Sequence, residues 1–115
     1  MAEQEMSYKV SSVGITDVGL VRHNNEDFWK QLPDLQFYVL ADGMGGHQAG
    51  EIASKLAVES LCEQFEKNYN VLIKDIDDAK DLLCELVQNV NGIVYLKGQE
   101  NIDLNGMGTT LCCLF

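Results

Sequence analysis

FYVLADGMGG, at residues 37–46, is the stretch that decides how this chain folds. Its first five residues form a short apolar run, which is typical of a β-strand covered on both faces. Three glycines follow within four positions, and glycine permits backbone angles that other residues resist. We therefore expect a buried strand over 37–41 and a break in regular structure from Asp42 to Gly46.

Two further strands are predicted upstream of this one. Residues 8–16 alternate loosely and are rich in β-branched and small side chains, which favours a strand that ends in a turn at 17–19. Residues 27–32 form another candidate strand, closed by the turn residues Pro33 and Asp34. Because only a short turn separates 27–32 from 37–41, we expect these two strands to form a hairpin.

Two long helices are predicted downstream. Apolar residues recur at helical spacing from about 49 to 67 and, more regularly, from 79 to 94. The second pattern follows Asp75, Asp77 and Asp78, and acidic residues favour the N-terminus of a helix. Residues 98–108 resemble a polar loop, and residues 109–115 begin a further strand.

The order of these elements indicates an α+β domain, in which an antiparallel sheet carries two long antiparallel helices on one face. The predicted strands offer more apolar surface than two helices on one side can cover. We therefore expect the other face of the sheet to need a cover of its own.

Composition narrows the possible functions. The chain has 115 residues, enough for one small domain, and its 18 acidic and 8 basic residues give a formal charge of −10. Such a charge repels nucleic acid and anionic lipid, so neither is an expected partner. We find no basic leader and no run approaching the roughly 18 apolar residues of a membrane span, so a cytoplasmic location is expected.

The four cysteines, Cys62, Cys84, Cys112 and Cys113, show no Cys-x-x-Cys spacing. Adjacent cysteines in a strand point to opposite faces, which does not suit a zinc site. We expect reduced packing cysteines rather than disulfides or metal ligands.

Several charged residues lie within or close to residues 37–46 in the sequence. Arg22, the pair Glu26 and Asp27, the Asp42-Gly43 dipeptide and His47 follow one another over a short part of the chain. Hard divalent ions take oxygen ligands, and a glycine lets its carbonyl approach a cation without a side chain in the way. Each element alone is more often a turn, a solvated loop, a helix cap or a surface residue, so the order and spacing carry the inference.

Three sequence motifs together resemble those of bacterial PPM-type (protein phosphatase 2C-like) serine/threonine phosphatases. They are TDVGLVRHNNED at 16–27, ADGMGGH at 41–47 followed by GEIAS at 50–54, and GMGTTL at 106–111. The resemblance covers nearly the whole chain in register. It implies a phosphatase 2C-like fold, an αββα sandwich, of which residues 1–115 would form the N-terminal portion.

The resemblance also implies a site for two Mg²⁺ or Mn²⁺ ions. Asp42 would bridge the two ions, Gly43 would offer its carbonyl and Glu26 would ligate one ion directly. Asp27 would hold metal-bound water. The implied reaction is hydrolysis of phosphoserine and phosphothreonine in proteins by a metal-activated water, without a phosphoenzyme, as part of cellular signalling.

Arg22 and His47 would act on the phosphate and on the leaving group. The planar guanidinium of Arg22 would hold two phosphate oxygens, which lysine does less well. His47 would act as a general acid toward the leaving alkoxide. The eukaryotic loop has histidine directly after Asp-Gly, where this chain has Met44, and this difference leaves the role of His47 open.

The chain departs from the family pattern in its extent. Family members are longer, and their second half supplies further aspartates, in an Asp-Gly and an Asp-Asn motif, that do not occur here. We therefore expect the 115-residue chain to bind metal weakly and to be inactive, or nearly so, on its own. The alternative is a non-catalytic, phosphatase-like module that binds a partner or a phosphopeptide.

Overall fold

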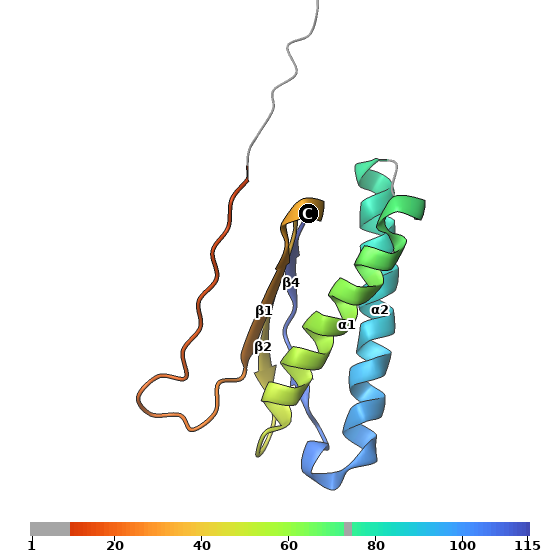
Figure 1. Ribbon diagram of the computed structural model, residues 1–115. Helices are drawn as coiled ribbons and strands as arrows, with labels where there is room; N and C mark the ends of the chain where they lie inside the picture. The colour runs from red at the N-terminus through yellow and green to blue at the C-terminus, as the bar shows by residue number, and fades with distance from the viewer. Residues whose placement is uncertain (1–9, 73–74) are drawn as a thin grey trace, which may run out of the picture.

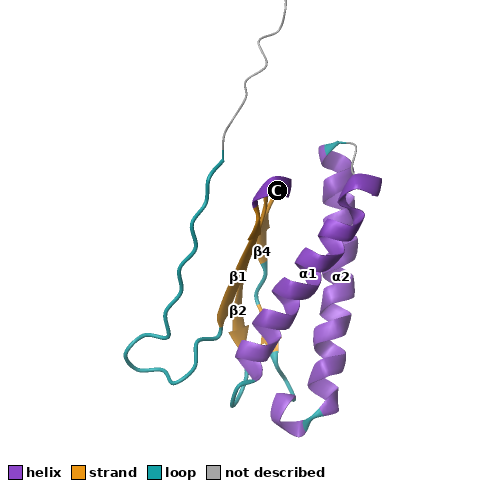
Figure 2. Cartoon of the chain, viewed as in Figure 1, coloured by secondary structure: helices purple, strands orange, loops and turns teal. Residues whose placement is uncertain are grey.

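The computed structural model describes residues 10–72 and 75–115. These form an antiparallel sheet with two long helices packed on one of its faces (Figures 1 and 2). In chain order the elements are β1 Asp27–Leu32, β2 Phe37–Met44, α1 Ala49–Leu72, α2 Ile76–Glu100, β3 Gly108–Thr109 and β4 Cys112–Leu114, with short 3-10 turns at Pro33–Leu35 and Ile102–Leu104. The predicted α+β architecture with both helices on one face is confirmed.

The hairpin of β1 and β2 is formed as predicted. Its turn begins with Pro33, whose fixed φ suits the start of a 3-10 turn, and closes at Gln36 in a left-handed conformation with φ 53°. The register runs from Leu32 opposite Phe37 to Asp27 opposite Asp42. Consequently, the far end of the hairpin carries two aspartates side by side.

β2 differs from the prediction in two respects. It continues through Asp42 and Gly43 to Met44, because β3 pairs with Gly43 and Met44 and supplies partners for their backbone groups. Its side chains alternate between buried and more exposed positions, so only one face is fully covered. The expected break in regular structure therefore begins at Gly45 rather than at Asp42.

The predicted strand over 8–16 is wrong for the part that the structure describes; Tyr8 and Lys9 lie outside it. Residues 10–16 form no strand and run along the sheet on the face opposite the helices (Figure 1). Their hydrogen bonds are made by side chains: Ser12 donates to Gln31, and Asn25 donates to the Thr16 hydroxyl at 2.8 Å. Without a backbone partner among the described residues, the segment has no ladder to join.

Both helices exceed their predicted length. α1 extends to Leu72, and α2 extends to Glu100, which takes up the start of the predicted 98–108 loop. The side chain of Asp75 caps α2 by accepting from the Asp78 amide at 2.9 Å, as its acidic start suggested. Gly98 is buried inside α2 because the returning chain passes close to it: a Cβ atom there would lie 3.2 Å from the Leu104 carbonyl oxygen.

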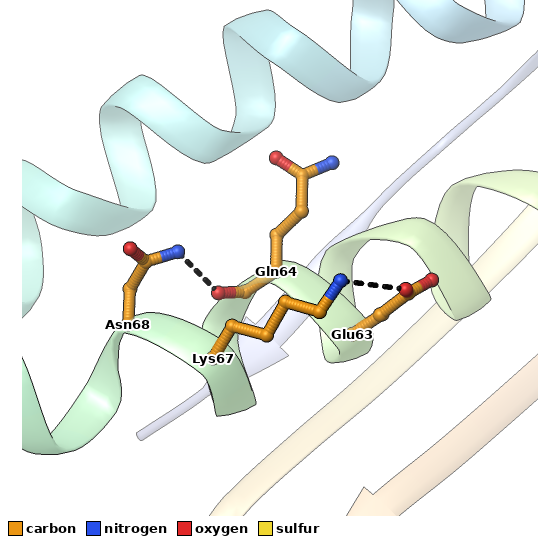
Figure 3. Close-up of polar contacts among 4 residues, drawn as sticks. All are labelled: Glu63, Gln64, Lys67 and Asn68. Carbon is orange, nitrogen blue, oxygen red and sulfur yellow. Dashed lines mark hydrogen bonds and ion pairs between the residues drawn. The ribbon is translucent and has the colours of Figure 1, made fainter.

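Outside its buried face, α1 carries an exposed ion pair and a half-buried hydrogen bond, both at helical spacing. Lys67 Nζ lies 3.0 Å from Glu63 Oε1, and the Asn68 amide donates to the Gln64 carbonyl at 2.7 Å (Figure 3). An exposed pair of this kind contributes only a few tenths of a kcal/mol. α1 is therefore held mainly by its buried face.

The core lies between the sheet and the helices. Phe37 stacks on Phe65 with ring centroids 3.9 Å apart, and Phe115 meets Phe65 edge-on at 5.4 Å. Around this aromatic cluster pack apolar side chains from both helices and from β2, namely Val39, Ala41, Ala53, Ala57, Val58, Leu61, Leu82, Leu86, Val90 and Val94.

The opposite face of the sheet is open in the described part of the chain. Leu40 and Leu114 point to this side and are 53% and 64% exposed. Val13 and Ile15, on the segment that runs along this face, are 94% and 92% exposed. The expectation that the two helices leave one apolar face of the sheet uncovered is confirmed.

The final predicted strand and the cysteines are confirmed in part. The strand over 109–115 is divided into β3 and β4, with Thr110 and Leu111 between them. All four cysteines are free, but only Cys62 is fully buried, whereas Cys84 and Cys112 are exposed. None of the helices in the described ranges is long and apolar enough to cross a membrane.

Candidate functional site

The candidate site lies where the β1–β2 hairpin meets the start of α1. Asp27 and Asp42 are cross-strand partners, and Glu26 directly precedes β1. The Gly43 amide donates to the Glu26 carbonyl at 2.9 Å and extends the hairpin by one pair. Hence the hairpin register brings the three predicted carboxylate residues to one end of the sheet.

The carboxyl groups of this end influence one another. Partial desolvation raises the pKa of Asp27, and the charge of Asp42 and a hydrogen bond with it raise the pKa further. The positive charge of Arg22 opposes this shift. Like charges placed directly opposite each other on a sheet are unfavourable, which is the situation that a bound cation relieves.

Two glycines allow β2, α1 and Glu26 to meet closely. A Cβ atom on Gly43 would lie 1.9 Å from the Gly50 carbonyl oxygen, which a side chain cannot accept. A Cβ atom on Gly50 would lie 2.7 Å from Glu26 Oε2. The Glu26 carboxylate therefore rests against the first turn of α1, in space that exists only because residue 50 has no side chain. The sequence prediction did not identify this role of Gly50.

Thr110 holds the backbone of Asp42. Its amide donates to the Asp42 carbonyl at 2.9 Å, and the Asp42 amide donates to the Thr110 hydroxyl at 3.0 Å. The sequence prediction placed Thr110 in a family motif without giving it a role. The signal was the Gly-Thr-Thr stretch at 108–110, but only the fold shows that it lies beside Asp42.

Arg22 and His47 lie near this end but are not joined to the carboxylates. Arg22 is exposed, and no salt bridge to it is formed within the described ranges. His47 lies in the loop between β2 and α1 with φ 53°, and its carbonyl accepts from the Asn24 amide at 3.3 Å. The structure thus holds the backbone around His47, while its imidazole is exposed.

The donors present suit a hard divalent ion but supply only one side of a site. Glu26, Asp27 and Asp42 offer carboxylate oxygens, and Gly43 contributes a carbonyl, which are ligand types that Mg²⁺ and Mn²⁺ prefer. However, nowhere in residues 10–72 and 75–115 do three His, Cys, Asp or Glu side chains gather closely enough to hold a metal. Additional ligands are therefore needed to complete a site here.

The sequence and the fold match those of known phosphatases. The family model described as Protein phosphatase 2C matches residues 21–115. The serine/threonine phosphatase stp of Listeria monocytogenes is 37% identical over 99 residues, and PstP of Mycobacterium tuberculosis is 38% identical over 102 residues. The chain therefore belongs to the protein phosphatase 2C family.

Solved structures of this family superpose on the chain. Serine/threonine phosphatase Stp1 from Staphylococcus aureus matches with a TM-score of 0.74 and 37% identity, over 88% of this chain and 41% of Stp1. The catalytic domain of PstP in complex with two manganese ions matches with a TM-score of 0.68 and 38% identity, over 84% of this chain and 39% of that domain.

This chain spans less than half the length of these relatives. The match to the Listeria phosphatase covers 84% of this chain but 38% of the relative, and the match to PstP covers 86% of this chain and 18% of the relative.

Proposed function

We propose that the protein is a metal-dependent serine/threonine phosphatase and that this chain provides the first part of its catalytic domain. The observation that supports this most directly is the set of Glu26, Asp27 and Asp42 at one end of the hairpin, where Gly43 and Gly50 leave room for the Glu26 carboxylate. The proposed substrates are phosphorylated proteins, by analogy with the relatives named as serine/threonine phosphatases, and the location that we propose is the cytoplasm.

In this proposal Asp42, Glu26 and Gly43 hold Mg²⁺ or Mn²⁺. Asp42 would be the ligand common to both ions, Glu26 would bind one of them through its side chain, and Gly43 would offer its carbonyl oxygen. Asp27 accepts hydrogen bonds from water at the same end of the hairpin. When bound, such ions polarise a phosphoryl oxygen and lower the pKa of water.

Arg22 and His47 complete the proposed roles. Arg22 is exposed and therefore able to reach a phosphate, for which the guanidinium offers two parallel N–H donors. His47, in the loop that follows β2, donates a proton to the alkoxide of the leaving serine or threonine.

We further propose that the chain alone is inactive or nearly so. Two carboxylates that ligate directly are too few to retain Mg²⁺, which gives up its water ligands reluctantly. The remaining ligands would come from the portion of the domain to which the relatives extend and this chain does not.

A second candidate function is that of a non-catalytic binding module. The observation that favours it is the lack of a three-ligand cluster within the described ranges, together with an exposed Arg22 that is free to contact a phosphopeptide. Two properties distinguish a binding module from a phosphatase. A binding module retains its affinity for a phosphopeptide without Mn²⁺, and it never releases phosphate.

The test is Mn²⁺-dependent release of phosphate from a phosphothreonine peptide. The assay compares this chain with a version joined to the part of the Listeria monocytogenes relative that follows its matched region, and circular dichroism verifies that both are folded. We expect no turnover by the chain alone and turnover by the joined protein that Asp42→Asn abolishes. Turnover by the short chain would contradict the proposal that it is incomplete, and a folded but inactive joined protein would favour the binding module.

Arg22→Ala tests the phosphate contact separately in the joined protein. We expect KM for the phosphopeptide to rise by about ten- to a hundredfold, because one charge-assisted contact contributes roughly 1.5–3 kcal/mol, while Mn²⁺ binding in calorimetry stays unchanged. A loss of the Mn²⁺ signal would count against the role assigned to Arg22.

A further inference from the structure

Thr110 lies directly opposite Asp42 at a gap in the sheet. On one side of the gap Leu40 pairs with Cys112, and on the other side Gly43 pairs with Thr109. Both pairs belong to the same antiparallel register, which places Thr110 across from Asp42. Yet residues 110 and 111 are not part of a strand, so the regular hydrogen-bond ladder is interrupted opposite Asp42, the proposed metal ligand.

The interruption consists of a change of hydrogen-bond acceptor, from the Thr110 carbonyl to the Thr110 hydroxyl. At a hydrogen-bonded position of a regular antiparallel ladder, the two opposed residues exchange both N–H···O=C bonds. Here the Thr110 amide donates to the Asp42 carbonyl at 2.9 Å as usual, but the Asp42 amide donates to the Thr110 hydroxyl, at 3.0 Å, and not to its carbonyl. The hydroxyl also lies 3.3 Å from the Asp42 carbonyl, to which it can donate.

The Thr110 carbonyl, which a regular ladder would use, has another partner. It accepts from the Thr109 hydroxyl at 2.8 Å. The hydroxyl groups of the two adjacent threonines therefore have different partners. The Thr110 hydroxyl bonds to the backbone of Asp42, whereas the Thr109 hydroxyl donates to the neighbouring Thr110 carbonyl.

We propose that Thr110 is a positioning residue for Asp42, whose backbone it clamps through its hydroxyl and its amide so that the carboxylate is directed toward the bound divalent ion. The proposal rests on the metal role proposed for Asp42. A strand residue that faces a regular carbonyl keeps its hydrogen bond whatever its partner's side chain is. The Asp42 amide instead depends on one hydroxyl group, so a single substitution can remove its hydrogen bond.

The replacement of a carbonyl acceptor by the Thr110 hydroxyl also explains why threonine suits position 110. Asp42 is exposed and lies next to Gly43, so neither burial nor a side chain at residue 43 restrains it. A β-branched residue is stiff at χ1 and keeps its hydroxyl at a fixed angle to the backbone. Thr110 thereby restrains Asp42 on the edge of β2 that faces away from β1.

Amide NMR of the 115-residue chain tests the proposal, with Mn²⁺ as the probe. Paramagnetic broadening of the Glu26, Asp42 and Gly43 amide signals reports binding near the carboxylates, and the Gly92 signal on α2 serves as the reference. The variants are Thr110→Val, which keeps the shape and removes the hydroxyl, and Thr110→Ser, which restores the hydroxyl. Thr109→Val is the matched control, because its hydroxyl does not contact Asp42.

We expect Thr110→Val to speed hydrogen exchange at the Asp42 amide and to raise the Mn²⁺ concentration for half-maximal broadening by about fivefold, the usual effect of losing one hydrogen bond. Thr110→Ser and Thr109→Val should stay within about twofold of the parent chain. If the spectrum of Thr110→Val collapses, Thr110→Ala is compared with Thr110→Ser in the same way.

Two results would overturn the proposal, and they differ in scope. If Thr110→Val exchanges faster at Asp42 but broadens at the parent Mn²⁺ concentration, Thr110 has a structural role only and the positioning role is wrong. If neither the parent chain nor the joined protein used in the phosphatase assay shows selective broadening at 26, 42 and 43, the metal role of Asp42 fails, and the inference about Thr110 fails with it.

Discussion

Gly43 and Gly50 act at the scale of single residues to bring β2, α1 and Glu26 together. The close approach involves backbone on both sides at Gly43, whereas at Gly50 the nearest atoms belong to the flexible Glu26 side chain. The same substitution, Gly to Ala, therefore has different consequences at the two positions.

Gly43→Ala is expected to destabilise the fold by about 2–3 kcal/mol, because the added methyl meets the Gly50 carbonyl and the backbone must shift. Gly50→Ala is expected to cost less than about 1 kcal/mol, since alanine favours the helix and Glu26 can rotate away. Urea unfolding followed by circular dichroism measures both. Equal losses for the two variants would contradict this reading of the contacts.

Cys62 provides a pH-dependent prediction at the same scale. Burial raises the pKa of its thiol to about 11 from an ordinary value near 9.0. The unfolded state therefore loses this proton at lower pH than the folded state, so stability falls as pH rises from about 9 to 11. We expect Cys62→Ala to weaken that alkaline loss by roughly 2 kcal/mol, as measured by urea unfolding at pH 8 and pH 10.5.

The reactivity of the cysteines checks the same burial independently. Cys84 and Cys112 are exposed, so they should react with a thiol reagent at pH 8 within minutes, whereas Cys62 should react only after unfolding. Mass spectrometry of partially alkylated chain identifies the modified residues. Early modification of Cys62 in the folded chain would contradict its place in the core.

The sequence was sufficient to predict the carboxylates of the candidate site but not the residues that hold them. Residue type and spacing along the sequence are enough to single out Glu26, Asp27 and Asp42. Gly50 and Thr110 act across space, on a side chain 24 positions earlier and a backbone 68 positions earlier, and no local pattern encodes such a contact. Only the hairpin register and the return of the chain after α2 bring them to the site.

At the scale of elements, local signals predicted some boundaries well and others poorly. β1 spans the residues predicted for it and ends where Pro33 and Asp34 predict a turn, since a proline turn is a strong local signal. The strand over 8–16 was wrong in its described part because β-propensity does not supply a partner. β2 extends past its apolar run because β3, distant in sequence, pairs with Gly43 and Met44.

The cap of α2 yields the prediction for this scale. Asp75 accepts a hydrogen bond from the Asp78 amide and satisfies one of the amides that the first turn leaves without a partner. Asp75→Ala is expected to destabilise the chain by about 1 kcal/mol in urea unfolding. Asp81→Ala, an exposed change of the same kind within α2, should alter stability by less than about 0.5 kcal/mol. If both variants behave alike, the cap contributes nothing beyond its charge.

At the scale of the whole molecule, the two faces of the sheet contribute unequally to the stability of the fold. The helix-covered face holds Phe37, stacked on Phe65 and buried completely, whereas the opposite face leaves Leu40 more than half exposed. Only buried apolar surface contributes fully to stability. The sheet of this chain is therefore stabilised from one side.

This asymmetry predicts the outcome of a matched pair of substitutions. Phe65→Ala removes a fully buried ring at the centre of the aromatic cluster and should cost about 3–5 kcal/mol, enough to unfold a small domain. Leu40→Ala removes a side chain that is 53% exposed and should cost less than about 1 kcal/mol in the 115-residue chain. In the joined protein used to test phosphatase activity, a second layer would cover Leu40, and the cost of Leu40→Ala should rise toward about 2–3 kcal/mol. Urea unfolding of both proteins measures the difference, and an unchanged cost of Leu40→Ala in the joined protein would mean that the added portion does not pack on this face.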